Sequence, residues 1–480
     1  MTTDGADIPG TTAFVPDLLY VGGRFEGGRA LVCDAEGRVV SVTRTEELTG
    51  EARTVRLRER AVLPGMVNAH SHAFQRVIRG RTEYRGRAGG DSFWTWREMM
   101  YAAAARLTPG DIYDASRMAF MEMALAGITS VGEFHYLHRA PGGSEYDDPN
   151  LLALEVVRAA RDVGLRIALL RVAYARAGYG KEPDPRQRRF IEPDHELFVH
   201  NCESLARALG GDRGAWAGVA PHSVRALPVE YLRALRSYAH ERHLPLHMHV
   251  AEQPAEVEAC VAEHGRTPVK LLADEGLLGP RFTAVHAVHV AGEEVALLAK
   301  ARACVCACPT TERNLGDGVV PADAYFAAGV RVSLGTDSHT QIDLLEDARE
   351  LEYNLRLKTL RRNVLAPAAD DERREGTPEV AALAARLFDC AAVRGAESIG
   401  APAGEFGPGR AADFFAVDLA DPAVAGASKD DLLPAVVFSL SRAAVRETAV
   451  GGRLVVEGGR HHAQDEIVSR FAALQRRLWE

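Results

Sequence analysis

The sequence lacks the features of a membrane protein, a disulfide-stabilised secreted domain or a nucleic-acid-binding protein. No stretch approaches the roughly 20 apolar residues of a membrane-spanning helix, and residues 1–14 carry neither the basic nor the apolar run of a secretory signal. The seven cysteines are odd in number and form no compact framework. A formal net charge of -9 disfavours nucleic acid or an anionic membrane as the main partner, although it leaves a small acidic substrate open. We therefore expect a cytoplasmic globular protein.

Three of the cysteines alternate in the string CVCACP, at Cys304, Cys306 and Cys308. Alternation places them on one face of a strand, where they could form a thiolate metal site. Structural zinc sites usually separate their cysteines by about two to four residues, and a free cysteine is a common small core residue. We expect a buried core strand here.

The pattern of apolar residues divides the chain into two kinds of segment. Residues 13–62 and the late strings GRAADFFAVD and VRETAVGGRLVVEGGR consist of short alternating runs separated by glycine turns, which is typical of antiparallel strands. Between them, helical stretches alternate with eight short apolar runs: MVNAHSH, TSVGEF, RIALLRVAY, WAGVAPHS, PLHMHV, FTAVHAV, ACVCACP and VRVSLGTDS. Eight strand–helix units predict an α/β fold with a (β/α)8 TIM-like barrel.

We place this barrel at residues 63–399. Residues 1–62 and 400–463 are expected to form a small discontinuous β-sandwich domain, and residues 464–480 an amphipathic C-terminal helix. The Pro- and Arg-rich string KEPDPRQRR, at 181–189, is predicted to be an exposed loop.

Polar side chains gather at the predicted carboxyl ends of the strands, where barrels of this kind carry their active sites. They are His70, His72, His222, Arg225, His247, His249, Glu252, His286 and Asp337. A lone histidine at a strand end is more often structural than a ligand, and a lone aspartate before a helix is often an N-cap. Several such residues on one rim favour chemistry instead, because imidazole nitrogens and a carboxylate suit Zn²⁺ or a similar ion.

Several of these strings resemble the amidohydrolase superfamily of metal-dependent barrels. They are PGMVNAHSH, the His249-x-x-Glu252 pair, the strand-end His286, GTDS around Asp337 and the late GEFGPGRAADFFAVD. TSVGEFHY carries Glu133 and His135, and no strand-end lysine occupies the place of the bridging lysine in binuclear members, so the chain resembles the mononuclear deaminase branch. Within it, HSHAFQR, DSFWTWREMMY, GEFHYLH, APHSVRAL, HVAEQ and CPTTERNLGDG together resemble the formimidoylglutamate deiminase family.

The resemblance implies a hydrolase that releases ammonia from N-formimino-L-glutamate in histidine degradation. It implies one divalent metal, zinc being expected, held by His70, His72, His249 and Asp337. A water activated by the metal would attack the C=N carbon. Asp337 would accept its proton, Glu252 would shuttle that proton to the leaving nitrogen, and His286 would stabilise charge or orient the attacked carbon.

The same resemblance implies substrate contacts from Gln75, Arg97, Tyr136, His222 and Arg225. Arg225 suits a carboxylate because its planar fork donates two parallel hydrogen bonds. In this family the loop that bears the second arginine reaches across a dimer interface, so we expect a homodimer, although Arg97 could also be an ordinary solvated residue. No chemistry is assigned to TTERNLGDG. The alternatives are a related deaminase acting on a heterocycle such as guanine or cytosine, and a non-enzymatic scaffold, which the complete ligand set disfavours.

Overall fold

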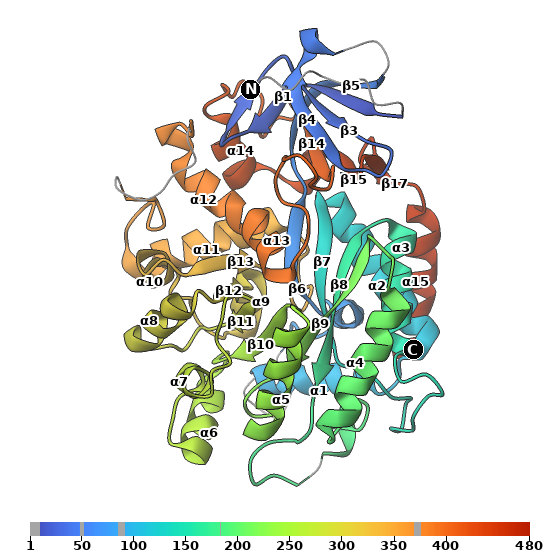
Figure 1. Cartoon of the computed structure of the whole chain (residues 1–480), viewed down its shortest axis with the longest axis vertical. Coiled ribbons are helices and arrows are strands. Elements are labelled where there is room, and N and C mark those ends of the chain that lie inside the picture. Colours follow the sequence, from blue (N-terminus) through green and yellow to red (C-terminus); the bar gives the residue numbers. More distant parts are fainter. Residues whose placement is uncertain (1–9, 49–51, 85–91, 183, 369–375) are drawn as a thin grey trace.

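The computed structural model of the chain describes residues 10–48, 52–84, 92–182, 184–368 and 376–480. Figure 1 shows two parts: a barrel of strands surrounded by helices, and a second sheet at the top of the view, built from the first and last strands of the chain. None of the helices in the described ranges combines the length and the apolar character of a membrane-spanning segment.

The barrel consists of eight strands that are hydrogen-bonded in sequence order. They are β6 (Met66–Ser71), β7 (Ile128–His135), β8 (Arg166–Ala173), β9 (Ala215–Pro221), β10 (Leu246–Val250), β11 (Phe282–His286), β12 (Cys304–Ala307) and β13 (Arg331–Leu334). Each neighbouring pair from β6 to β13 is parallel. The strands are almost entirely buried, as expected for a sheet covered by helices. All eight predicted strands, and the predicted barrel, are thus confirmed.

The first and last strands of the barrel approach each other at one point. A parallel bridge joins Ser71 to Asp337, just beyond the end of β13. Here the Asp337 amide donates to the His70 carbonyl (3.0 Å) and the His72 amide donates to the Asp337 carbonyl (3.1 Å). The barrel therefore closes at its carboxyl rim, through residues that the sequence singled out for chemistry.

Helices separate most of the barrel strands, and two more pack against the second sheet or its connections. Their bounds are α1 (Phe93–Ala104), α2 (Pro109–Leu125), α3 (Leu151–Val163), α4 (His195–Leu209), α5 (Val229–Glu241), α6 (Pro254–His264), α7 (Pro268–Asp274), α8 (Gly292–Ala301), α9 (Pro309–Leu315), α10 (Ala322–Ala327), α11 (Leu344–Thr359), α12 (Ala382–Ala391), α13 (Val393–Ile399), α14 (Leu432–Ser439) and α15 (Gln464–Trp479). Short connections leave the strand ends free to carry a site on one rim.

The second sheet combines strands from both ends of the chain. It contains β1 (Thr12–Val21), β2 (Arg24–Glu26), β3 (Arg29–Cys33), β4 (Val39–Arg44), β5 (Arg53–Pro64), β14 (Phe414–Asp418), β15 (Val445–Val450), β16 (Arg453–Glu457) and β17 (Arg460–His461). The two ends join where β5 pairs antiparallel with β14, with Val62 opposite Ala416. Phe14 and Phe414 pack edge to face at 4.8 Å in a small separate core. This separate sheet from the two terminal segments confirms the predicted fold class.

A buried ion pair lies between β8 and the helices α3 and α4 that cover it. Arg171 on β8 is fully buried (0% exposed) and Glu192 is nearly so (4%). The guanidinium donates to both carboxylate oxygens, at 2.5 and 3.0 Å, and to Asn150 Oδ1 at 2.9 Å. The Asn201 amide donates to Glu192 as well, at 2.8 Å. The pair is therefore hydrogen-bonded on both sides, as a buried charge requires.

Two expectations for local segments had different outcomes. Cys304, Cys306 and Cys308 are buried free cysteines on and just beyond β12, so the core assignment is confirmed. The expectation that 181–189 is an exposed loop is wrong for part of it, because Gln187 and Arg189 are each only 2% exposed. Arg189 donates to the backbone carbonyls of Arg139 and Leu107, and these contacts hold the segment against the barrel. Residue 183 lies outside the described residues.

Candidate metal and active site

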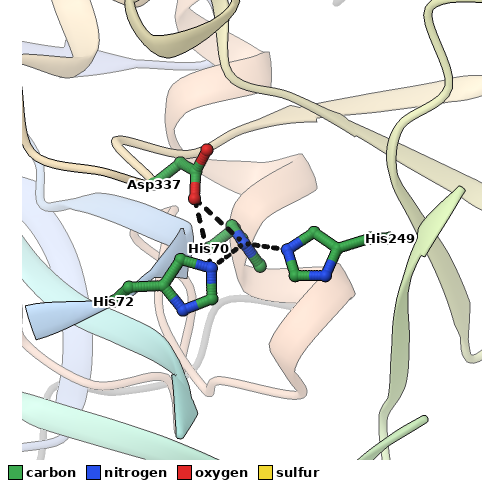
Figure 2. A group of neighbouring side chains, drawn as sticks. All are labelled: His70, His72, His249 and Asp337. Carbon is green, nitrogen blue, oxygen red and sulfur yellow. Dashed lines mark hydrogen bonds and ion pairs between the residues drawn. The ribbon is translucent and has the colours of Figure 1, made fainter. Parts of the chain in front are cut away.

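Four of the predicted residues converge at the rim of the barrel (Figure 2). His70 lies on β6 with His72 directly after it, His249 lies on β10, and Asp337 follows β13. His70 Nε2 is 3.1 Å from His72 Nε2 and 3.2 Å from His249 Nε2. Asp337 Oδ1 is 3.4 Å from His70 Nε2 and 3.2 Å from His72 Nε2. One atom of each residue therefore points at a common centre.

The hydrogen bonds of the outer ring nitrogens indicate what this centre can hold. His72 Nδ1 lies 2.9 Å from the Phe134 carbonyl, and His249 Nδ1 lies 3.2 Å from the His222 carbonyl. A carbonyl only accepts, so both Nδ1 atoms carry hydrogen and both Nε2 atoms present lone pairs. Two lone pairs and a carboxylate oxygen facing one another repel unless a cation lies between them. The donor set therefore fits a divalent metal of borderline softness, with three imidazoles and one carboxylate.

Burial keeps the imidazoles of the four-residue ligand group neutral, while neighbouring groups keep its carboxylate ionised. Burial lowers the pKa of His70 to about 3 and holds that of His249 well below its usual range, which keeps both imidazoles neutral. Burial alone would raise the pKa of Asp337, but the adjoining His70 and His72 imidazoles outweigh this and hold that pKa well below its usual range. Neutral imidazoles and an ionised carboxylate are the forms that bind metals.

Two features of the backbone near Asp337, a positive φ angle and a glycine, bring this segment close to His70. Asp337 itself has φ 44°, in the left-handed region that non-glycine residues seldom adopt. Gly335, two residues earlier, passes so close to β6 that a Cβ there would lie 2.7 Å from His70 Cβ. Glycine at 335 thus permits the close approach that brings the carboxylate to the imidazoles.

Glu252 and His286 lie beside this group and face each other. Glu252 is in the loop between β10 and α6, ahead of the helix, and its Oε1 is 3.7 Å from His286 Nε2. His286 Nε2 is also 3.8 Å from Asp337 Oδ2, the oxygen turned away from His70 and His72. Burial raises the pKa of Glu252. Burial would lower the pKa of His286, but the carboxylates around it outweigh this and hold it well above its usual range.

A cavity opens next to these side chains, and all the other predicted site residues line it. The lining includes His72, Gln75, Arg97, Tyr136, His222, Arg225, His249, Glu252, His286 and Asp337, together with Phe93, Trp96, Met100 and Leu315. His70 is fully buried, and its ring packs edge to face against that of His72. The structure therefore brings together every residue that the sequence proposed for metal binding, proton transfer or substrate contact.

The cavity is cationic on the side away from the metal-ligand group. Among the described residues, the Arg225 guanidinium has no ion-pair or hydrogen-bond partner. Arg97 donates to the Tyr174 hydroxyl at 3.1 Å and lies over the Trp94 and Tyr101 rings, without a carboxylate partner in the same described part of the chain. Two arginines in one cavity, neither in an ion pair with a described residue, create a site that favours an anion.

Gln75, Tyr136 and His222 add neutral polar groups to the same cavity. Gln75 Nε2 donates to the Tyr136 hydroxyl at 2.9 Å, while Gln75 Oε1 is buried without a partner in the described structure. The backbone carbonyl of His222 accepts from His249, so this residue also helps to hold a metal ligand. His247 Nε2, by contrast, donates to the Ser398 carbonyl of α13 at 2.9 Å, so its contact is structural.

Several polar residues that support the site escaped the sequence reasoning. Glu133 accepts from Ser71 Oγ (2.5 Å) and from the Ala73 amide (2.7 Å), and it thereby fixes the chain on both sides of His72. Gln187 donates to the hydroxyls of Tyr101 and Tyr174, each at 2.9 Å. Of these two residues, Glu133 was visible at a strand end, whereas Gln187 lies in a connection that carries no periodic signal.

Several known proteins are similar to this chain in sequence or in structure. Formimidoylglutamate deiminase of Pseudomonas aeruginosa is 40% identical over 412 residues, which cover 86% of this chain and 88% of that protein. A 5-methylthioadenosine/S-adenosylhomocysteine deaminase of Halobacterium salinarum is 29% identical over 482 residues, covering 99% and 97%. The crystal structure of an amidohydrolase from Brucella melitensis matches with a TM-score of 0.87 and 34% identity, over 98% of this chain and 100% of that one.

The match to a family as a whole is equally extensive. Residues 61–455 match the amidohydrolase family, a span that begins in β5 and ends in β16 and so contains all eight barrel strands and all four metal-ligand candidates. With the barrel and the ligand group at its rim, these matches show that the chain belongs to the amidohydrolase family.

Proposed function

We propose that this protein is a metal-dependent deiminase that hydrolyses N-formimino-L-glutamate to N-formyl-L-glutamate and ammonia in histidine catabolism. The observation that carries the proposal is the Arg225 guanidinium, which lines the cavity beside the metal-ligand group and forms no ion pair or hydrogen bond with the described residues; the Glu256 and Glu252 carboxylates act on it only at longer range. A half-buried guanidinium whose donors are unpaired favours an anionic ligand. The name of the Pseudomonas relative, 40% identical, supports the same substrate.

In this proposal His70, His72, His249 and Asp337 hold one divalent ion, and zinc suits three imidazoles and a carboxylate best. When bound, such an ion supplies Lewis acidity, which makes water a nucleophile near neutral pH.

The neighbouring side chains manage the protons of the reaction. Water adds its oxygen to the formimino carbon, and Asp337 Oδ2, which is turned away from His70 and His72, accepts the proton that the water loses. Glu252, whose pKa burial raises, delivers a proton to the imino nitrogen. His286 faces both carboxylates and stabilises the charge that develops on the attacked group. The hydroxyl of the adduct then passes its proton through Glu252 to the same nitrogen, the C–N bond breaks, ammonia leaves and the formyl C=O remains. The proton held by Asp337 finally returns to Glu252, which restores both carboxyl groups.

The substrate's two carboxylates account for the cationic side of the cavity. Arg225 would bind one of them with its planar fork, and Arg97, held by Tyr174, would bind the second. Gln75, Tyr136 and His222 would orient the chain between them, and Gln75 Oε1 is a free acceptor for a substrate N–H.

Ammonia release across a substrate panel tests the proposal. The panel contains N-formimino-L-glutamate, its aspartate analogue, guanine, cytosine and S-adenosylhomocysteine, with the metal content of the protein measured in parallel. We expect a clear preference for N-formimino-L-glutamate. A preference for a heterocycle would overturn the proposal in favour of a deaminase that acts on such a ring. Two observations favour that alternative: Phe93 and Trp96 give the cavity an aromatic lining, and the Halobacterium relative is a deaminase of adenosine derivatives by its name. Protein with neither bound metal nor activity after adding Zn²⁺ would point to a scaffold.

The Arg225→Gln variant tests the carboxylate contact directly. Because a hydrogen bond to a charged group contributes about 1.5–3 kcal/mol, we expect kcat/KM for N-formimino-L-glutamate to fall about 10- to 100-fold, mainly through KM. Arg60→Gln is the matched control, since Arg60 pairs with Glu447 in the second sheet and does not line the cavity. Unchanged turnover by Arg225→Gln would contradict the substrate assignment.

The predicted domain boundaries, homodimer and cytoplasmic location belong to the same proposal. Arg97 lies in the cavity of its own chain beside residues of that chain. A molar mass measured by light scattering decides whether a second subunit is present.

A further inference from the structure

The string TTERNLGDG, to which the sequence assigned no chemistry, forms a support for the rim of the barrel. Its residues make up most of α9 and the turn after it. The Thr311 hydroxyl contacts Ser338 Oγ at 2.9 Å and accepts from the Ser338 amide at 3.2 Å, next to Asp337. Asp317 accepts a hydrogen bond from Gln253, the residue after Glu252. The segment thus contacts the neighbours of two residues in the proposed machinery.

Glu312 makes the most direct of these contacts. It is 2% exposed, and its Oε1 lies 3.2 Å from His286 Nδ1 and 2.9 Å from the Cys308 amide nitrogen. The carboxylate can only accept from that amide, and an imidazole N–H is the matching partner for the same oxygen. His286 Nε2 is then directed at Glu252 Oε1 (3.7 Å) and Asp337 Oδ2 (3.8 Å).

From this geometry we infer that Glu312 is a positioning residue of the active site, which keeps hydrogen on His286 Nδ1 and orients Nε2 toward the reacting groups. The inference rests on the proposed function, because it assigns Glu312 a role through His286 in that reaction. It adds a carboxylate–histidine pair to the site beyond the residues that the sequence singled out.

The backbone of His286 gives an independent reason why such an anchor is needed. His286 and Ala287 both have positive φ values, 67° and 48°, so β11 ends in a conformation that costs energy for residues with a Cβ. Strained backbone at a site persists only when the surrounding contacts determine it. The Glu312 carboxylate, itself tied to the Cys308 amide at the start of α9, supplies one such contact from the neighbouring strand connection.

A purely local role for Glu312 would be to cap the N-terminus of α9. A second glutamate, Glu294, has such a capping role away from the proposed machinery and therefore allows the two roles to be separated. Glu294 is also buried (3% exposed). It accepts from the Ala291 amide at the start of α8 (2.9 Å) and from the Thr267 hydroxyl (2.6 Å). Glu294 therefore makes one cap contact and one side-chain contact, as Glu312 does, but it touches no residue of the proposed machinery. Glu294→Gln is the matched control for Glu312→Gln.

The first test compares the kinetics of the two variants with N-formimino-L-glutamate. A glutamine at 312 can still accept through its carbonyl oxygen but has lost the negative charge beside the imidazole. Loss of a group that orients a metal ligand typically costs about 10- to 100-fold in activity. Because Glu312 would orient His286 in the same way, we expect kcat of Glu312→Gln to fall by that factor. KM is expected to stay within about twofold, and both variants should keep the wild-type metal content and lose similar thermal stability.

The second test does not depend on the substrate. In protein labelled with ¹⁵N in histidine only, the His286 Nδ1–H resonance is assigned by its loss in His286→Asn. We expect it to move upfield in Glu312→Gln, because a neutral acceptor makes a weaker hydrogen bond than a carboxylate, and to stay unchanged in Glu294→Gln.

Equal kinetics of the two variants, or an unmoved His286 resonance, would overturn the inference. If Glu312→Gln does not fold, the absence of an Nδ1–H resonance for His286 in the wild-type spectrum would overturn it as well. If the wild-type protein releases no ammonia from N-formimino-L-glutamate, the proposed function fails, while the resonance comparison still decides whether Glu312 positions His286.

Discussion

The buried pair between Arg171 and Glu192 offers a stability prediction whose size follows from its geometry. Two guanidinium hydrogen bonds and the Asn201 amide stabilise the Glu192 carboxylate. Burial would raise the pKa of Glu192, but the charges of His138 and Arg171 and these hydrogen bonds lower it from its usual 4.5 to about 2. At about 1.4 kcal/mol per pKa unit, the ionised form contributes about 3 kcal/mol to folding at neutral pH.

The sign of the pH dependence follows from this lowered pKa. Below pH 4.5 the unfolded chain binds a proton at Glu192 that the folded chain still excludes, so this contribution shrinks as the pH falls toward 2. The change is about 1.4 kcal/mol per pH unit within that window. Above pH 4.5 the contribution is constant.

We expect Glu192→Gln to lower the free energy of unfolding by about 3–5 kcal/mol at pH 7, because it leaves the buried Arg171 charge without its counter-ion. The deficit relative to wild type should shrink by about 1.4 kcal/mol between pH 7 and 3.5. Urea titrations at several pH values, followed by far-UV circular dichroism, measure both quantities. Asp465→Asn is the control, because its partner Arg460 is 63% exposed and exposed pairs contribute about 0–1 kcal/mol. A deficit below about 1 kcal/mol at pH 7, or one independent of pH down to 3.5, would refute this reasoning.

Two further predictions concern the rim. Glu252→Gln should lower kcat by at least about 100-fold with unchanged metal content, because it removes the proposed proton carrier and leaves the four ligands in place. The control is Glu258→Gln, a change at an exposed residue of α6, which should keep the wild-type rate. A reduced metal content in Glu252→Gln would contradict the assignment. Gly335→Ala should cost about 1–3 kcal/mol and weaken metal retention, since the added methyl group would lie 2.7 Å from His70 Cβ. The melting temperature measures the loss of stability, and metal analysis measures the retention of the ion. Gly279→Ala is the control, because nothing lies within 4 Å of its new methyl group. Equal behaviour of the two alanine variants would show that the close approach at 335 is unimportant.

The sequence predicted those parts of the site that lie at the ends of strands. A buried strand shows as an apolar run, and a barrel places the residue after each run on one rim, so His70, His249, His286 and Asp337 could be gathered before their distances were known. Glu312 and Gln187 could not, because both lie in connections whose path depends on tertiary contacts. The Pro- and Arg-rich composition around Gln187 even favoured exposure, which its hydrogen bonds to Tyr101 and Tyr174 reverse.

The pairing of β5 with β14 has a consequence for how the chain is made. Val62 and Ala416 are opposite each other in the sheet, yet the whole barrel is encoded between them. At about 5–20 residues per second, a ribosome needs roughly 20 to 70 s to travel from one to the other. During that time the β5 edge and the face around Phe14 have no β14 to cover them. The nascent chain thus exposes an unpaired apolar edge while the barrel is synthesised, and a chaperone or a transient partner would protect it from aggregation.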